Sequence, residues 1–283
     1  MKQKRKTEFF KKFRKHKLAN VGLIIIIIEI LMVTFLPIIL GLDPYSIDST
    51  GFNQAPCAKH ILGTDDIGRD LFARVLYGGR VSLIVGICST IISIIIGLPL
   101  GILAGYYRGI IENIVMRLAD IFMSIPAMVL ILVIVAVFEP SIITIIVVIG
   151  ITGWTGVAKL IYGNVLSVRN KEYVEAARAI GTKDREIIMR YVLPNSIAPL
   201  WMSVAFRISQ AIMTESGLSF LGAGIQSPQA SWGNIIYAAQ NLVVLTKRWW
   251  VWVPAGVLLM ITIICINLVG EGIRDALDPK MKR

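Results

Sequence analysis

Residues 18–40 read LANVGLIIIIIEILMVTFLPIIL, a stretch of 23 residues in which Glu29 is the one charged side chain. As an α-helix rising 1.5 Å per residue, the stretch is about 34 Å long, enough to cross a hydrocarbon core of about 30 Å. It is longer than the apolar region of a cleaved signal sequence, and no small-residue cleavage site follows it. We therefore expect residues 18–40 to remain in the protein as a first transmembrane helix.

Five further apolar runs follow, at residues 81–107, about 121–138, 141–162, about 197–214 and 250–271. The sequence therefore predicts an all-α integral membrane protein with six transmembrane helices. The chain of 283 residues is 55% hydrophobic and 17% charged, whereas soluble domains are about 45–50% apolar and about 25% charged. Its net charge of +11 does not indicate a nucleic-acid partner, because nucleic-acid binding needs far more polar surface than this chain offers.

The positions of Lys and Arg predict the orientation, because basic residues in short connections stay on the cytoplasmic side. One set of connections holds 22 basic residues and the opposite set holds six, while Arg207 lies within the fifth predicted span. Both termini are therefore predicted to be cytoplasmic. The expected organisation is a basic arm at 1–17, the first span at 18–40, an outside loop at 41–80, a transmembrane core at 81–272 that includes a cytoplasmic loop at 163–196, and a cytoplasmic tail at 273–283.

Glycine and proline residues predict how some spans pack and bend. Gly97, Gly101 and Gly105 recur every four residues in the second span, a spacing that permits close approach of another helix. Pro126 in the third span predicts a kink. These residues are common in membrane bundles, so packing is the expected role and lining of a pathway the alternative.

The long cytoplasmic loop contains KEYVEAARAIG at residues 171–181. Four of these residues recur at i, i+3, i+4 and i+7, which predicts a short helix with one apolar face and charge on the other. Small residues on that face would admit close approach of another protein. A helix lying on lipid headgroups fits the same pattern. The four residues are Tyr173, Ala176, Ala177 and Ile180.

A turn and a second helix are expected after the first. Gly181 suits the left-handed position that ends a helix, and Thr182 suits the N-cap of a helix that begins at Lys183. Leu193 and Pro194 are expected to stop that second helix.

The loop resembles the EAA motif of permease subunits in binding-protein-dependent ABC importers. In that motif Glu-Ala-Ala is followed after three residues by Gly and, further on, by Ile, one residue and Leu-Pro. The matching residues are Glu175, Ala176, Ala177, Gly181, Leu193 and Pro194, and Tyr191 stands where the motif usually has Ile.

Three other stretches resemble one branch of that family, the C-type permeases of dipeptide, oligopeptide and nickel importers. GTDDIGRD at 63–70 is similar to their segment between the first two spans, and LSFLGAGIQ at 218–226 is similar to an outside loop. The ending at 267–279 is also similar. Together the resemblance covers nearly all of the chain from about residue 18 onward.

The resemblance implies a type I ABC importer permease fold and a set of partners. The chain would pair with a homologous second permease in a bacterial or archaeal cytoplasmic membrane, surrounded by lipid. Two cytoplasmic ATPase subunits and an extracytoplasmic substrate-binding protein would complete the importer. The sequence has no Gly-x-x-x-x-Gly-Lys-[Ser/Thr] loop, so we expect a transport subunit without enzymatic activity, cofactor or metal, with ATP and Mg bound in the partner ATPase subunits.

Three functions are weighed for the chain. The first is a permease forming half of the pathway of a di- or oligopeptide importer, with residues 163–196 coupled to the ATPase. The second is a permease for nickel or a metal chelate, because the same motifs occur there. The third is a stand-alone secondary transporter or channel, with Glu29 and Glu215 as proton carriers, against which the Glu-Ala-Ala loop argues.

Charged residues outside the loop provide further candidates. Glu29 is a candidate for the pathway, because it lies near the middle of the first span, where an unpaired charge costs at least about 3 kcal/mol. Glu215 lies at the outer end of the fifth span and is a candidate for the outer gate, because the stretch that resembles the family's outside loop follows it. Hydrogen bonding between packed helices is the alternative for both. No nucleophile or metal-ligand set accompanies the outside cluster, so we expect it to be structural or to dock the binding protein. The outside cluster consists of Asp65, Asp66, Arg69 and Asp70.

Overall fold

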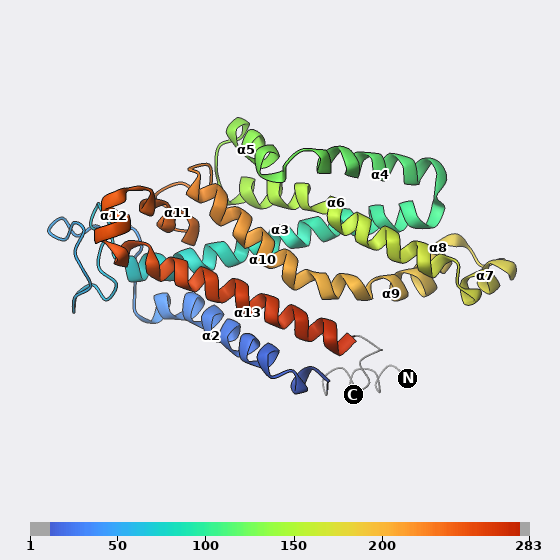
Figure 1. Cartoon of the computed structure of the whole chain (residues 1–283), viewed down its shortest axis with the longest axis horizontal. Coiled ribbons are helices and arrows are strands. Elements are labelled where there is room, and N and C mark those ends of the chain that lie inside the picture. The colour runs from blue at the N-terminus through green and yellow to red at the C-terminus, as the bar shows by residue number, and fades with distance from the viewer. Residues whose placement is uncertain (1–11, 278–283) are drawn as a thin grey trace.

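The computed structural model describes residues 12–277, and within that range it contains helices and no strand. Parts of the predicted arm at 1–17 and tail at 273–283 lie outside the described residues. The bundle is formed by long helices, most of which run side by side along it (Figure 1). They are α2 Lys17–Ile39, α3 Leu71–Tyr107, α4 Gly109–Ser124, α5 Ala127–Val137, α6 Ile142–Arg169, α10 Ala198–Phe220 and α13 Val253–Leu277.

The membrane-length helices agree with an all-helical membrane fold. Helices α2, α3, α6 and α13 are each long and apolar enough to cross a membrane, and α4 with α5 passes the same test as one broken span. Helix α10 has 23 residues but is less apolar. The exact number of six transmembrane helices therefore stays a prediction.

The third predicted span is broken rather than continuous. Helices α4 and α5 are bent by 87° at the break between them, where Ile125 adopts an extended backbone and Pro126 is the N-cap of α5. Proline has no N–H for helical hydrogen bonding and disfavours helical backbone in the residue before it. The kink expected at Pro126 is confirmed, and it separates two helices.

Helix α3 begins earlier than the predicted second span. Asp70 is its N-cap, and the Ala73 amide donates to Asp70 Oδ1 at 2.9 Å. Residues 71–80, predicted to belong to an outside loop, are therefore helical, while their placement outside the membrane stays a prediction. These turns are held by packing against α11, Trp232–Tyr237, because a Cβ at Gly79 would lie 2.7 Å from the ring of Trp232.

Helices α3 and α6 pack through their backbones at the centre of the bundle. A Cβ at Gly97 would lie 2.5 Å from the Trp154 carbonyl oxygen, and one at Gly101 would lie 2.6 Å from that of Ala158. Gly105 continues this contact one turn further on. The close packing expected of these three glycines is confirmed, and it makes α3 and α6 one tightly packed unit.

The two ends of the bundle carry different short elements (Figure 1). One end holds the segment between α2 and α3 together with α11 and α12. The other end holds α7, α8 and α9, and the described beginning of α2 and end of α13 lie on that side too. His16 Nε2 is 3.4 Å from Asp275 Oδ2 there. The described ends of the chain and the long loop thus share one side, while the orientation of the termini and the assignment of that side to the cytoplasm stay predictions. The short elements are α7 Glu172–Ala179, α8 Asp184–Ile187, π-helix η1 Ile188–Val192, α9 Leu193–Ser196, α11 Trp232–Tyr237, 3-10 helix η2 Ala238–Gln240, α12 Leu242–Lys247 and 3-10 helix η3 Trp249–Val251.

Candidate functional site

The first loop helix, α7, ends in a tight backbone turn. Gly181 has φ +80°, its amide donates to the Arg178 carbonyl at 3.0 Å, and the Thr182 amide donates to the Ala177 carbonyl at 3.1 Å. These two bonds form a Schellman motif, whose left-handed residue favours glycine because it has no Cβ. The left-handed role predicted for Gly181 is confirmed.

The second half of the loop differs from the prediction in two respects. Its N-cap is Lys183 rather than Thr182, and α8 begins at Asp184. Pro194 does not stop the helix, because α8 continues through η1 into α9. Pro194 lies in the first turn of α9, directly after the π-helix η1. The predicted loop 163–196 also begins too early, because α6 extends to Arg169.

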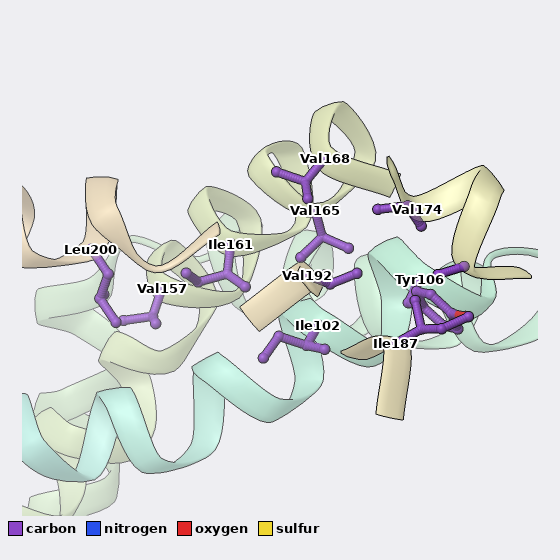
Figure 2. Packing of buried hydrophobic residues seen from close by; sticks show 11 residues of the cluster. Ile102, Tyr106, Val157, Ile161, Val165, Val168, Val174, Ile187, Val192 and Leu200 are labelled. Carbon is purple, nitrogen blue, oxygen red and sulfur yellow. The ribbon is translucent and has the colours of Figure 1, made fainter. Parts of the chain in front are cut away.

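The buried face of α7 attaches the loop to the ends of α3 and α6. Val174 is fully buried and Ala177 is 4% exposed. Figure 2 shows Val174 among apolar side chains from α3, α6 and the elements that follow α7. The predicted apolar face is therefore only partly correct, because Ala177 is its one member buried in the described chain, while Tyr173, Ala176 and Ile180 are exposed. The cluster comprises Ile102, Tyr106, Val157, Ile161, Val165, Val168, Val174, Ala177, Ile187, Val192 and Leu200.

Polar contacts strengthen the same attachment. The Tyr106 hydroxyl at the end of α3 donates to Asp184 Oδ1 at 2.6 Å. The Arg178 guanidinium lies 5.7 Å from the centre of the Tyr106 ring, a cation–π distance. Tyr106 therefore holds both loop helices, α7 through Arg178 and α8 through Asp184.

The outward side of the loop presents large apolar side chains. Ile180 is 82% exposed and Met189 is 57% exposed. Tyr173 is exposed as well, and its ring centre lies 6.4 Å from that of Tyr191. Glu175 is exposed on the same helix. Several large apolar side chains exposed on one loop are typical of a protein or membrane contact.

Glu29 lies at the seam between α2 and α13. It is 6% exposed, and the Thr262 hydroxyl donates to Glu29 Oε1 at 2.6 Å. Its other oxygen, Oε2, is buried and has no hydrogen-bond partner within residues 12–277. This placement fits the interhelical alternative, and a role of Glu29 in the pathway stays a prediction.

Glu215 is fully buried between α10, α3 and α11. Ser219 donates to its Oε1 at 2.8 Å, and Ser82 and Ser216 donate to Oε2 at 3.2 and 3.4 Å. Ser82 also accepts from the Trp232 amide at 3.3 Å. Glu215 thus holds three segments together, and its gating role stays a prediction.

Three of the four residues in the outside cluster make contacts within the chain. Asp65 Oδ2 lies 2.6 Å from Arg69 Nε and 3.6 Å from Arg74 Nε. Asp70 caps α3 and lies 2.7 Å from His60 Nδ1. Asp66 is exposed and remains the member most accessible to a binding protein. Among the described residues, no group of three or more His, Cys, Asp or Glu is arranged to hold a metal ion.

The bundle and its firmly attached loop define a multi-pass permease of the ABC importer class. The inward-facing MetNI methionine ABC transporter has the same fold, with a TM-score of 0.61 at 20% identity over 74% of this chain and 96% of that chain. Residues 97–283 match the binding-protein-dependent transport system inner membrane component, and residues 7–56 match the N-terminal TM domain of oligopeptide transport permease C. The chain belongs to this family of inner-membrane transport components.

Two curated relatives resemble nearly the whole chain. The oligopeptide transport system permease protein OppC of Bacillus subtilis (strain 168) is 37% identical over 273 residues, which cover 96% of this chain and 88% of that protein. The dipeptide transport system permease protein DppC of Alkalihalophilus pseudofirmus is 38% identical over 275 residues, which cover 97% and 90%. The resemblance to C-type permeases predicted from three motifs is therefore confirmed.

Proposed function

We propose that this chain forms half of the translocation pathway of an ATP-driven importer of di- or oligopeptides. The names of the relatives support peptides over nickel, because OppC and DppC are permeases for oligopeptides and dipeptides. Membership of a permease family also argues against the stand-alone transporter. The organism that makes the chain would be bacterial or archaeal, with the protein in its cytoplasmic membrane.

The two-sided loop is the observation that carries the proposal. Its inner side, with Val174 and Ala177, packs on α3 and α6, whereas its outer side leaves Tyr173 and Ile180 exposed. A helix that is attached to the spans on one side and open on the other is suited to receive a moving partner. We assign that outer side to an ATPase subunit, whose closure on ATP would move α3 and α6 as a unit.

The remaining partners follow from the division of labour in such importers. A homologous permease would complete the pathway, and a binding protein would deliver peptide at the end that holds α11, α12 and Asp66. Two ATPase subunits would bind ATP and Mg, because this sequence lacks a phosphate-binding loop.

The test replaces one exposed apolar side chain at each end of the bundle. Ile180→Asp should reduce retention of the ATPase subunits on the purified complex at least about tenfold, because burying an isoleucine contributes roughly 1.5–3 kcal/mol. Ile61→Asp is the matched control, since Ile61 is 61% exposed at the opposite end. Equal ATPase retention in the two variants would refute the assignment of the outer side of α7.

A further inference from the structure

Arg207 is a cation in the interior of α10 with no acidic partner among the described residues. It lies nine residues after the start of the helix, about 14 Å along its axis. Its Nε is buried without a hydrogen-bond partner, and no carboxylate within residues 12–277 forms an ion pair with it. By contrast, Lys159 on the neighbouring α6 lies 2.8 Å from Asp120. An arginine left unpaired in a span costs several kcal/mol and therefore marks a functional position.

The surface of α6 is shaped to accept this guanidinium. Arg207 Nη1 donates to the Gly153 carbonyl at 3.3 Å. A Cβ at Gly156 would lie 3.0 Å from Arg207 Nη2, so any larger residue there would crowd the guanidinium. The guanidinium is held against backbone on one side, and one carbonyl satisfies only a small part of its five donors.

Arg207 belongs to a polar stripe on the part of α10 that is open in the single chain. Ser203 precedes it by one helical turn, and Gln210 and Thr214 follow it at helical spacing, so that all four lie within about 60° around the helix axis. Gln210 is exposed and the other three are half-buried. The Ser203 and Thr214 hydroxyls donate to backbone carbonyls within α10. Lipid would leave the exposed Gln210 amide and the unpaired Arg207 donors without hydrogen bonds, so the stripe faces water or a polar partner in the assembled importer.

We propose that Arg207 binds a carboxylate of the transported peptide as it passes the middle of the membrane. This inference rests on the proposed function and names the residue that recognises the cargo. A guanidinium fork matches a carboxylate in shape and charge and forms two parallel hydrogen bonds with it. Every unmodified peptide carries one such group at its C-terminus, whatever its side chains. Recognition of that group would accept peptides as a class without selecting a sequence.

The test measures uptake by the complete importer in vesicles. Alanine peptides of two to five residues are offered as free acids and as C-terminal amides. Arg207→Gln should slow uptake of the free acids about tenfold relative to wild type, because losing a hydrogen bond to a charged group weakens binding by at least about that factor. It should slow uptake of the amides less. Arg207→Lys should keep part of the free-acid rate, and Ser203→Ala, in the same stripe, should slow both forms equally and slightly.

The outcomes separate this inference from the proposed function. Uptake of no peptide by the wild-type importer would contradict the proposed function itself. If Arg207→Gln reduces the uptake of free acids and amides equally, the inference about Arg207 is overturned and the proposed function is not affected. Equal reduction together with poor assembly would also overturn the inference and would assign Arg207 to an acidic group of the second permease. If Arg207→Gln does not assemble, the same acid-to-amide comparison is made on Arg207→Lys.

A second measurement does not depend on whether amides reach the permease. Gln210→Cys is made after Cys57, Cys88 and Cys265 are replaced by serine, and it is treated with a charged thiol reagent in vesicles of both orientations. It should react faster than Ile264→Cys, at a position 50% exposed on apolar α13, and free-acid trialanine should slow the reaction. A reaction no faster than that of Ile264→Cys would overturn the inference.

Discussion

Val174→Ala tests whether the loop is attached to the spans by its buried face. The substitution removes two methyl groups from a side chain that is fully buried. At about 0.8 kcal/mol for each buried carbon, the loss is roughly 1.6 kcal/mol. Incomplete collapse of the cavity brings it to about 2 kcal/mol. The docking equilibrium of α7 on α3 and α6 should therefore shift about thirtyfold toward the undocked state.

Hydrogen exchange of the purified subunit measures this shift directly. Helix α7 has eight residues, too few for a stable helix in isolation, so its amides should exchange when it undocks. We expect the amides of residues 175–180 to exchange about thirtyfold faster in Val174→Ala, with amides in the middle of α6 unchanged as an internal reference. Peptide-driven ATP hydrolysis by the assembled importer should fall in parallel.

Ile180→Ala is the matched control on the same helix. It removes more apolar atoms than Val174→Ala does, but Ile180 is 82% exposed, so exchange of α7 in the isolated subunit should not change. Its effect should appear instead as weaker retention of the ATPase subunits. Unchanged exchange in Val174→Ala would show that the buried cluster does not hold α7, and the reasoning about a firmly attached loop would fail.

Three further substitutions test the packing, the buried acid and the outside segment. Gly101→Val should destabilise the subunit by about 1–3 kcal/mol through overpacking, seen as a lower unfolding temperature in detergent. Gly163→Val, where a Cβ meets no described atom within 4 Å, should leave the unfolding temperature unchanged. Equal unfolding temperatures of the Gly101→Val and Gly163→Val variants would contradict the close packing of α3 and α6. Glu215→Ala should lower the fraction folded after heating more than Glu215→Gln, because the amide still accepts hydrogen bonds from serine; equal losses would contradict that network. Hydrogen bonds hold the pKa of Asp48 well below its ordinary value. The Lys59 ammonium has the largest effect, and the Thr50 hydroxyl, the Thr50 amide and the His60 imidazole add smaller ones. A carboxylate whose pKa is lower in the folded than in the unfolded state stabilises the folded segment above the unfolded pKa of about 3.9. This stabilisation is lost as the pH falls from that value toward the folded pKa. Asp48→Asn should therefore speed proteolysis of residues 41–70 at pH 7 and have a smaller effect near pH 3, and equal proteolysis of both proteins at pH 7 would contradict this stabilisation.

The helices could be predicted from the sequence because length and hydropathy are local properties. The stretch at 18–40 corresponds to α2 within one residue at each end. The start of α3 could not be predicted in the same way, because Arg74 and Gly79 interrupt the apolar pattern. Packing against Trp232, which is more than 150 residues away in the chain, compensates for that interruption.

The loop shows a similar division between local and distant causes. The left-handed turn at Gly181 follows from the residue itself, so its position was predictable. The buried side of α7 was not, because the larger side chains Tyr173 and Ile180 suggested the wrong face. Val174 and Ala177 are three residues apart, and that weaker signal indicates the inner side only once the ends of α3 and α6 are known to lie beside it.

The packing around α6 gives a physical route from the loop to Arg207. Helix α6 shares the cluster of Figure 2 with α7 at one end and meets the glycines of α3 along its length. Further along α6, Gly153 and Gly156 lie against the Arg207 guanidinium. Because close-packed helices shift as units rather than deform, motion imposed on α7 moves the α6 surface that holds this side chain. A change in the contact between α6 and Arg207 would expose or withdraw its unpaired donors, so we infer that the affinity for a passing carboxylate changes with the state of the ATPase.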